Sequence, residues 1–242
     1  MGILGIIGGN GVVATNRLLQ LVEELFTKNG AYRDVHHPEM IVWQATQAPS
    51  RSMFLEGLGE SFIPDYVRIG RQLKLCGCTE LCMCCNTAHY AVDELQAKIE
   101  LPFINIIELV AKKCDQLGCK KVLVLCTAGL RKYGLYEKSF TCYASQTRVI
   151  YPSDEFQLLV TKGICNAKSK VRFENENLEK EHPKNYFQKV CDYYSMNEGV
   201  DCIVGGCTDI SNVFFYNNSK VRYVDSLQTL AEAIFLKYSK AF

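Results

Sequence analysis

The chain has 242 residues, 48% of them hydrophobic, and carries 27 Lys and Arg residues against 26 Asp and Glu residues, a net charge of +1. This length allows one or two domains with a substantial hydrophobic core. The balanced charge forms no dominant basic face, and no apolar run reaches the about 20 residues that a membrane helix needs. We therefore expect neither nucleic acid nor a membrane as a partner.

The chain uses cysteine heavily, with 13 residues of this type. Several lie inside apolar, strand-like runs, where cysteine behaves as a small hydrophobic residue. The segment from Met1 to Gly9 lacks the basic region of a signal peptide and predicts a first strand instead. We therefore expect a cytoplasmic protein in a reducing environment, with most of its thiols structural.

We expect no metal ion, although Cys82 and Cys85 have the spacing of metal ligands. Side chains alternate along a strand, so Cys82 and Cys84 point to one face and Cys85 to the other. A second Cys-x-x-Cys pair or a matching His pair, which would complete a tetrahedral site, is missing from the sequence.

Short apolar strands and amphipathic helices alternate along the chain. Strands are expected over residues 3–7, 40–44, the run into Cys85, 102–104, 121–126, 148–151, 200–204 and 221–224. Helices are expected over residues 12–28, 62–75, from 88 onward, 106–117, around Tyr136, and over 154–164, 186–196 and 226–238, with a polar loop or exposed helix start over 168–184. This alternation is typical of an α/β fold with parallel sheets.

The pattern occurs twice. A first strand near Gly8 precedes Cys85 at nearly the separation at which the strand before Cys126 precedes Cys207, and a glycine lies eight residues before each cysteine. Such a repeat indicates two pseudo-symmetric α/β domains facing each other across a central cleft. We expect one domain at residues 1–106 plus 226–242 and the other at 107–225.

Cys85 and Cys207 each follow a predicted strand and precede polar, helix-starting residues. Open α/β folds build their sites at the carboxyl ends of strands, and a helix N-terminus stabilises a thiolate. Two such thiols predict acid/base chemistry on a small anionic substrate. His89, one helical turn after Cys85, either tunes this thiol or is a packed or capping histidine.

Two further features lie near strand ends. The glycines of the turn Gly8–Gly11 would let backbone amides approach an anion, although taken alone the turn favours a purely structural interpretation. Arg51 follows Pro49 and Ser50 in a predicted loop. Its guanidinium is either a solvated surface charge or a bidentate clamp for a carboxylate.

Six segments together resemble the aspartate/glutamate racemase family, and most of all its aspartate racemase branch. They are Gly5–Gly11 with Ala14 and Thr15, Ala48–Arg51, Cys85–His89, Pro102–Ile107, Thr127–Tyr136 and Gly206–Asp209. The Cys-Asn-Thr-Ala-His segment paired with the late Gly-Cys-Thr-Asp segment is more specific than either alone.

The resemblance implies a cofactor-independent racemase with a small amino-acid substrate bound between two α/β domains, assembled as a homodimer. It implies that Cys85 and Cys207 are the catalytic acid/base pair. The substrate-binding residues that it implies are Gly9, Asn10 and Gly11 at the pocket floor, Asn86, Thr87 and Thr208 for the α-carboxylate and amino group, Arg51 for the side-chain carboxylate, Thr127, and a lysine at Lys168 or Lys170.

Several positions depart from the family pattern. Leu130 and Tyr133 replace two hydroxyl residues, and Asp209 stands in place of Glu. These departures leave open a relative that acts on another carboxylate, of the hydantoin racemase or maleate isomerase type. They also leave open a non-catalytic amino-acid-binding protein on the same fold. A redox or zinc thiol protein is the remaining alternative.

Overall fold

The computed structural model of the protein describes residues 2–239, so Met1 and residues 240–242 of the expected first domain lie outside it. The chain divides into two compact units. One contains the chain up to Ile106 together with the chain from Leu227 onward, and the other is Ile107–Ser226. Each unit contains a parallel sheet of four strands, which confirms the expected α/β class with two parallel-sheet domains.

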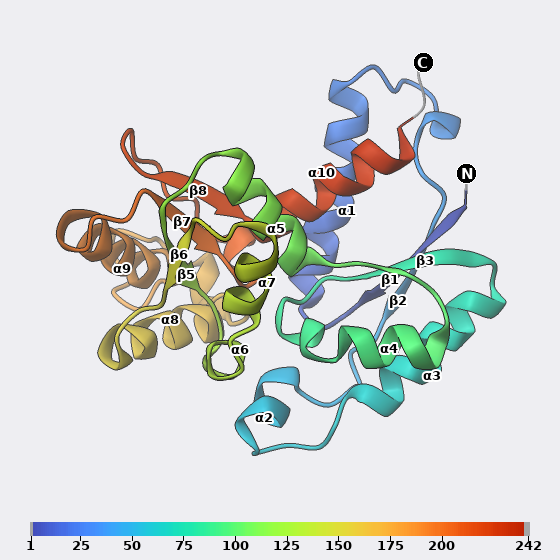
Figure 1. Ribbon diagram of the computed structural model, residues 1–242, viewed down its shortest axis with the longest axis horizontal. Coiled ribbons are helices and arrows are strands. Elements are labelled where there is room, and N and C mark those ends of the chain that lie inside the picture. The colour runs from blue at the N-terminus through green and yellow to red at the C-terminus, as the bar shows by residue number, and fades with distance from the viewer. Residues whose placement is uncertain (1, 240–242) are drawn as a thin grey trace. The chain divides into compact units, whose positions relative to one another are not determined.

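The sheet of the first unit has the strand order β2-β1-β3-β4. Figure 1 shows α1 and α10 on one side of this sheet and α3 and α4 on the other. The elements of this unit are β1 (Ile3–Gly8), α1 (Val12–Lys28), a 3-10 helix (Asp34–His36), β2 (Met40–Gln44), α2 (Arg51–Glu56), α3 (Ile63–Leu75), β3 (Cys78–Met83), a 3-10 helix (Thr87–Ala91), α4 (Val92–Ile99), β4 (Phe103–Ile104) and α10 (Ser226–Tyr238).

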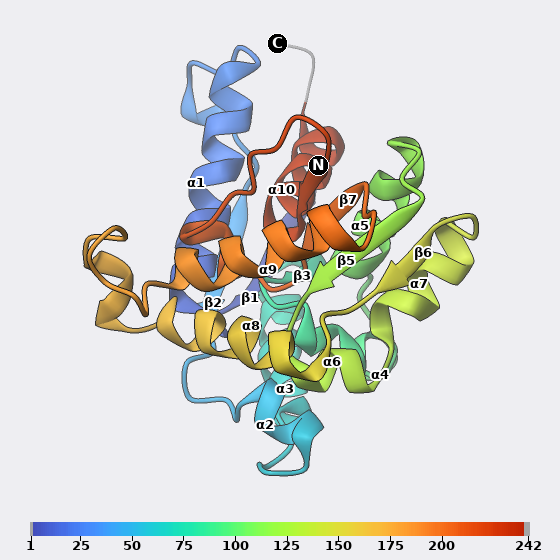
Figure 2. The same cartoon turned by 90° about the vertical axis from the view of Figure 1, so that its left-hand side faces the viewer.

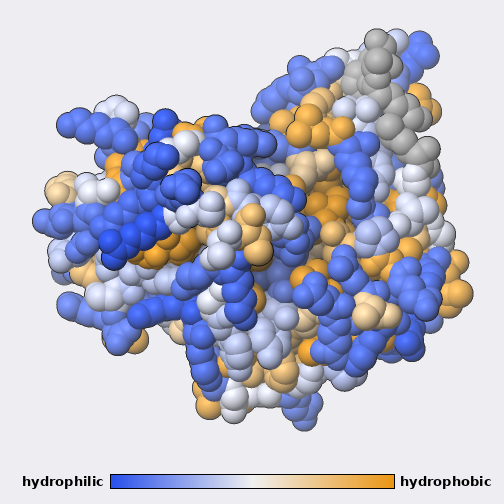
Figure 3. Space-filling model, in the orientation of Figure 1, coloured by the Kyte–Doolittle hydropathy of each residue, from blue (hydrophilic) through white to orange (hydrophobic). Residues whose placement is uncertain are grey.

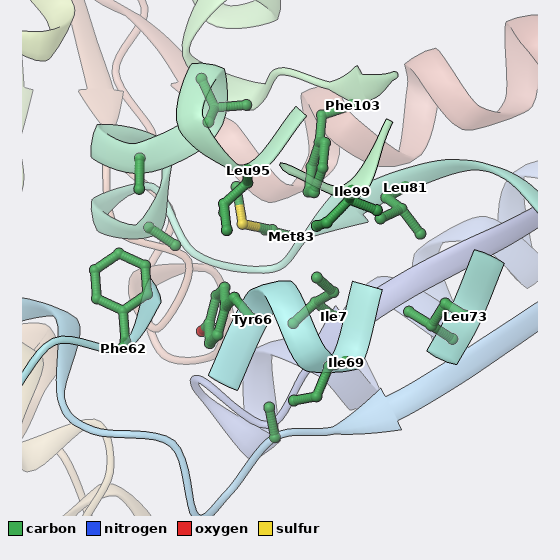
Figure 4. Packing of buried hydrophobic residues seen from close by; sticks show 14 of the residues in the cluster. Ile7, Phe62, Tyr66, Ile69, Leu73, Leu81, Met83, Leu95, Ile99 and Phe103 are labelled. Atoms are coloured by element: carbon green, nitrogen blue, oxygen red, sulfur yellow. The ribbon is translucent and has the colours of Figure 1, made fainter. Parts of the chain in front are cut away.

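The core between this sheet and helices α3 and α4 forms because apolar side chains recur at helical spacing. On α3 the buried residues Tyr66, Ile69 and Leu73 lie three or four positions apart, so they share one face. That face packs against Met83 of β3 and Leu95 of α4 in a continuous hydrophobic cluster (Figure 4). The packing places the carboxyl end of β3 beside α3.

The sheet of the second unit has the strand order β6-β5-β7-β8. Helices α8 and α9 lie side by side and share a hydrophobic cluster with β5 and β7 (Figures 1 and 2). The elements of this unit are α5 (Ile106–Gln116), β5 (Lys121–Leu125), α6 (Ala128–Lys132), α7 (Leu135–Tyr143), β6 (Arg148–Ile150), α8 (Asp154–Asn166), a 3-10 helix (Lys170–Phe173), α9 (Pro183–Asn197), β7 (Cys202–Gly205), a 3-10 helix (Ile210–Asn212) and β8 (Arg222–Asp225).

The two strand orders correspond strand for strand, as the sequence repeat predicts. In both sheets the first strand of the unit pairs with the second on one side and the third on the other. Gly77 and Gly199, which precede the third strands, have φ values of +92° and +59°. Glycine adopts this left-handed conformation without a steric penalty, so the turns before β3 and β7 share the same backbone conformation for the same reason.

The expected helix after Cys207 is wrong. Only a 3-10 turn, Ile210–Asn212, follows β7, because Ile210, Phe214 and Tyr216 are all buried and draw the chain into the core of the unit. After Cys85 the expected helix begins as the 3-10 helix Thr87–Ala91, and the α-helical part starts only at Val92. A helix dipole therefore acts less directly on either thiol than the sequence indicates.

The surface mixes polar and apolar residues. On the face drawn in Figure 3, hydrophilic and hydrophobic groups are interspersed. The exposed apolar side chains Leu75, Leu178 and Met196 come from different parts of the chain. Across residues 2–239, none of the helices combines the length and the apolar character that crossing a membrane requires.

Candidate active site

Cys85 and Cys207 occupy equivalent positions in their units. Cys85 lies two residues beyond Met83, the last residue of β3, and Cys207 lies two residues beyond Gly205, the last residue of β7. Strands β3 and β7 hold the same place in the two sheet orders. Each thiol is therefore at the carboxyl edge of its own sheet, where open α/β folds bind their ligands.

The thiol of Cys85 is accessible, whereas those of the cysteines just before it are not. Cys85 is half-buried, and Cys82 and Cys84 are fully buried. Burial raises the pKa of Cys84 from the usual 9.0 to about 12 and raises the pKa of Cys82 well above 9.0. Both stay protonated at neutral pH, so Cys85 is the thiol of this strand end that can exchange a proton with a ligand.

His89 supports the backbone of Cys85. Its ring is buried, its Nδ1 lies 2.8 Å from the carbonyl oxygen of Cys85, and its Nε2 accepts from the N–H of Ile106 at 3.3 Å. A neutral ring with its proton on Nδ1 satisfies both contacts. Of the two roles left open by the sequence, these contacts correspond to the packed and hydrogen-bonded histidine. Asn86 and Thr87, which follow Cys85, are buried as well.

The first turn is a tight one that requires glycine. Gly9 has a φ of +74°, and a Cβ on it would lie 2.5 Å from the backbone nitrogen of Ala45. The N–H of Gly9 donates to Oγ1 of Thr15 at 2.9 Å. Gly11 is the residue that caps the start of α1. The positive φ and the close approach of the Ala45 backbone explain why residue 9 is glycine. That Gly9 and Gly11 lie at the floor of a substrate pocket stays a prediction.

Three predicted site residues of the first unit gather around Tyr66. The Nδ2 atom of Asn10 donates to Oη of Tyr66 at 2.5 Å and to the carbonyl oxygen of Ile7 at 3.3 Å. Burial raises the pKa of Tyr66 far above its usual value, with the Arg51 guanidinium opposing the shift and a charge on Cys85 adding to it. Among the described residues, Oδ1 of Asn10 is a buried acceptor with no hydrogen-bond partner.

Arg51 is the first residue of helix α2, a helix that the sequence does not predict. Ser50 caps this helix, since its side chain accepts from the N–H of Met53 at 3.4 Å. The guanidinium Nη1 of Arg51 donates to the carbonyl oxygen of Pro49 at 2.8 Å and to that of Ala48 at 3.4 Å. These contacts hold the half-buried side chain in one orientation.

Cys207 belongs to a chain of polar contacts in the second unit. Its sulfur donates to Oδ2 of Asp209 at 3.8 Å, and the same oxygen lies 2.9 Å from Nζ of Lys168. Asp209 and Thr208 are buried, whereas half of the Lys168 side chain is exposed. Of the two lysines considered from the sequence, Lys168 is the one that forms an ion pair with Asp209, so a charged carboxylate replaces the expected Glu beside the thiol and is held by a lysine.

Among known protein families, the one described as Asp/Glu/Hydantoin racemase matches residues 4–234, which is nearly the whole chain. The chain belongs to the Asp/Glu/hydantoin racemase family. It is therefore an isomerase of the amino-acid racemase type, as the sequence predicts. The thiol pair described above lies within the matched range.

Known proteins of this kind resemble the racemase along its whole length. The broad-specificity amino-acid racemase RacX of Bacillus subtilis (strain 168) is 24% identical over 97% of both chains. Aspartate racemase of Picrophilus torridus covers 100% of this chain and 96% of its own at 24% identity, with a TM-score of 0.79. Glutamate racemase of Francisella tularensis, solved with D-glutamate, covers 100% of this chain and 84% of its own at 12% identity, with a TM-score of 0.61. At these identities the solved structures establish the shared fold.

The segment after β5 explains one departure of this racemase from the family pattern. Thr127 caps α6, because its Oγ1 accepts from the N–H of Leu130 at 3.3 Å. Leu130 is fully buried, and Tyr133 is half-buried. The replacement of a hydroxyl residue by Leu130 is therefore accommodated in the core of the second unit.

Tyr66 is the site neighbour that sequence reasoning missed. It lies among apolar residues on the buried face of α3, where a tyrosine is easily taken for simple core packing. A buried tyrosine hydroxyl nearly always needs a hydrogen-bond partner, and that need was the available signal. The partner, Asn10, lies 56 positions earlier in the chain, and only the fold brings the two together.

Proposed function

We propose that this racemase interconverts the enantiomers of an acidic amino acid without a cofactor. Aspartate is the substrate that we propose first, and glutamate is the alternative acidic substrate. Residues 1–106 with 226–242 form one domain, which carries Cys85, and residues 107–225 form the other, which carries Cys207. The equivalent placement of these thiols at the ends of β3 and β7 is the observation that supports the proposal most strongly. Inversion by proton transfer needs one base and one acid, and thiols supply both near neutral pH.

The proposed step moves one proton off the α-carbon and one proton onto it. The thiolate of one cysteine takes the α-proton, and the electron pair of the C–H bond stays on the substrate, delocalised into the carboxylate. The thiol of the other cysteine then gives its proton to the opposite face. Thiol and thiolate have exchanged places, and no electron has left the system, so the balance closes without a further reagent.

Cys207 is the proposed acid of the resting enzyme. A carboxylate next to a thiol favours the protonated thiol, and Oδ2 of Asp209 accepts from Cys207 at 3.8 Å. Lys168 holds that carboxylate in place at 2.9 Å. Cys85 is then the base that takes the α-proton in the first step, and proton exchange of the two thiols with solvent after product release restores the starting form.

Polar side chains near both thiols would hold the substrate and its developing negative charge. Buried amide and hydroxyl groups act more strongly than exposed ones because the local dielectric is low. The unpartnered Oδ1 of Asn10 suits a substrate ammonium group. The full assignment is Gly9, Asn10 and Gly11 at the pocket floor, Asn86, Thr87 and Thr208 for the α-carboxylate and amino group, Arg51 for the side-chain carboxylate, and Thr127 and Lys168 from the second domain.

The test is α-proton exchange in D₂O, followed by NMR and chiral chromatography, with the L and D forms of aspartate and of glutamate. Wild type is compared with Cys85→Ser and Cys207→Ser under reducing conditions. Cys76→Ser and Cys142→Ser are the matched controls, because they remove one exposed thiol from each unit. Exchange with inversion is expected in wild type and both controls, and a loss of at least about a thousandfold in both catalytic variants.

Two outcomes would overturn this proposal. Inversion that persists in either catalytic variant would contradict the two-thiol mechanism. A folded, reduced wild type that exchanges the α-proton of none of the four substrates would contradict the assignment of an acidic amino acid as the substrate. In that case the same exchange assay with hydantoins, and NMR of maleate for cis–trans isomerisation, test the related activities, and calorimetry with the same amino acids tests a pure binding role.

A broader substrate range is the second candidate. The similar Bacillus subtilis protein is named a broad-specificity amino-acid racemase, and the present chain matches 97% of its length. The half-buried Tyr133, where the family pattern has a hydroxyl residue, supports a pocket with a less polar wall. Adding neutral amino acids to the exchange assay separates the two candidates, because an enzyme specific for acidic amino acids inverts aspartate and glutamate alone.

We further assign the enzyme to the cytoplasm as a homodimer. The 13 cysteines, all free in the structure, suit a reducing compartment. Light scattering of the reduced protein tests the assembly, and a monomer at micromolar concentration would contradict it.

A further inference from the structure

Three cysteines that the proposed reaction does not use converge in the second unit. They are Cys114 near the end of α5, Cys119 in the turn after it, and Cys202 at the start of β7. Their three sulfur atoms all lie within 4.8 Å of one another. All three side chains are buried, and the most exposed of them, Cys119, is 2% accessible. We refer to these residues as the thiol cluster.

The surrounding backbone holds the cluster in place. Gly118 has a φ of +67°, which turns the chain at the end of α5, and the N–H of Cys119 donates to the carbonyl oxygen of Cys114 at 3.0 Å. The Asp201 carboxylate accepts from the N–H of Lys120 at 2.8 Å and from that of Lys121 at 2.8 Å. The start of β7 is thereby fixed to the start of β5, and the ligand geometry is set before any ion binds.

The cluster is separate from the proposed catalytic thiol of the same unit. Cys202 is the first residue of β7, and Cys207 lies two residues beyond its last. Five residues at about 3.3 Å each put the two on the order of 15 Å apart, at opposite ends of the sheet. A ligand at the cluster therefore leaves Cys207 free to act.

The spacing of the sulfurs matches a three-coordinate metal ion. Metal–sulfur bonds of about 2.3 Å place the sulfurs of a planar trigonal site about 4 Å apart. Among the described residues, the cluster contains only these three thiols, with no His, Asp or Glu to complete a tetrahedron. Thiolate ligands select soft ions such as Cu(I), for which three sulfurs complete a trigonal site, whereas structural Zn²⁺ sites take four ligands.

We propose that Cys114, Cys119 and Cys202 bind one Cu(I) ion in a trigonal, all-sulfur site. Each thiol that becomes a thiolate releases its proton to solvent, and no electron is transferred. The access route is short, because Cys119 lies between the exposed residues Gly118 and Lys120. Simple packing would need only small apolar side chains here, whereas the fold brings the two thiols at the end of α5 together with a third from the start of β7.

The test is an anaerobic Cu(I) titration of the reduced full chain against a coloured Cu(I) chelator. The background is Cys85→Ser/Cys207→Ser, which removes the catalytic thiols as binding sites. The cluster variant is Cys114→Ala/Cys119→Ala/Cys202→Ala. The matched control, Cys76→Ala/Cys142→Ala/Cys165→Ala, also removes three thiols, all of them exposed and outside the cluster. One ion per chain is expected in the background and the control, and affinity at least a hundredfold lower in the cluster variant.

X-ray absorption of the Cu(I)-loaded background protein keeps the test valid if the cluster variant does not fold. Three sulfur neighbours and no nitrogen or oxygen neighbour are expected. Loss of binding in the exposed-thiol control would overturn the site, as would two or four ligands around the ion. Binding of Zn(II) in preference to Cu(I) would also overturn it, as would a disulfide within the cluster that persists under reducing conditions.

Discussion

Cys84 and Cys85 are adjacent in the sequence, and the fold gives them different chemistry. Cys84 is fully buried with a pKa raised to about 12, and Cys85 is half-buried. The thiolate is the nucleophile in alkylation, and at pH 8 roughly one part in ten thousand of a thiol with such a pKa is ionised. Burial is the main cause of the difference between the two thiols, and a residue's type does not reveal it.

Selective alkylation tests this difference. Iodoacetamide at pH 8 should label Cys85 at least about ten times faster than Cys84. Tandem mass spectrometry of the peptide that contains both residues measures the two rates. In urea the preference should vanish, since both thiols are then in water. Equal labelling of the folded protein would contradict the assigned environments.

Asp209→Asn tests the proton assignment at Cys207. Without the carboxylate the thiol ionises at lower pH, so the alkaline limb of the pH–rate profile should move to lower pH. Turnover at pH 8 should therefore fall, because a smaller share of Cys207 carries the proton that it must donate. Asp209→Glu, which keeps the charge, should restore much of the limb. Asp154→Asn is the control, because the Asp154 side chain is 95% exposed.

At the scale of elements, the 3-10 helix Thr87–Ala91 connects a catalytic candidate to the rest of the first unit. His89 lies within it and bridges the carbonyl oxygen of Cys85 and the N–H of Ile106. The two contacts tie the end of β3 to Ile106, the residue that follows β4 and Asn105 in the first unit. The orientation of the Cys85 loop thus depends on one side chain four positions away.

His89→Phe should loosen this connection. The substitution keeps a planar ring but leaves a buried N–H and a buried carbonyl without their partner, which costs about 1–3 kcal/mol. Urea unfolding should show that loss, and D₂O exchange should fall with it. Asp93→Glu, which keeps the charge at an exposed position in the first turn of α4, should change neither. An unchanged unfolding midpoint in His89→Phe would show that the bridge is not needed.

Element boundaries show where local pattern suffices. The strand Met40–Gln44 and the helix Ser226–Tyr238 lie where the sequence predicts them. The sequence does not predict helix α2, because its six residues carry too short a pattern, and it predicts a helix after Cys207 where the structure has a 3-10 turn. In that segment the burial of Ile210, Phe214 and Tyr216 outweighs local helix signals.

At the scale of the whole molecule, many thiols are buried without charge. Burial raises the pKa of Cys82, Cys84, Cys126 and Cys191 above the usual 9.0. Between pH 9 and 12 the unfolded chain loses these protons while the folded chain keeps them. The folded state then binds more protons than the unfolded state, so its stability falls as the pH rises.

Alkaline unfolding measures this effect. The free energy of unfolding should be nearly constant from pH 7 to 8.5 and then fall by about 1.4 kcal/mol per pH unit for each such thiol. Urea titrations of the reduced protein at four pH values test it. Cys84→Ala should make the slope shallower by one thiol's share, and Cys76→Ala, at an exposed position, should leave it unchanged. A wild-type midpoint that does not change up to pH 10.5 would contradict the expected linkage.

The sequence by itself determined the α/β class, the internal repeat, the family, and the two cysteines at equivalent strand ends. Hydrophobic periodicity and turn residues act over a few positions, so they are visible without the fold. Only the tertiary structure decided which of the 13 thiols are accessible, that Asn10 meets Tyr66, that Lys168 meets Asp209, and that three cysteines form a cluster. Burial and long-range contacts depend on residues far apart in the chain, which pack together only when the sheets form.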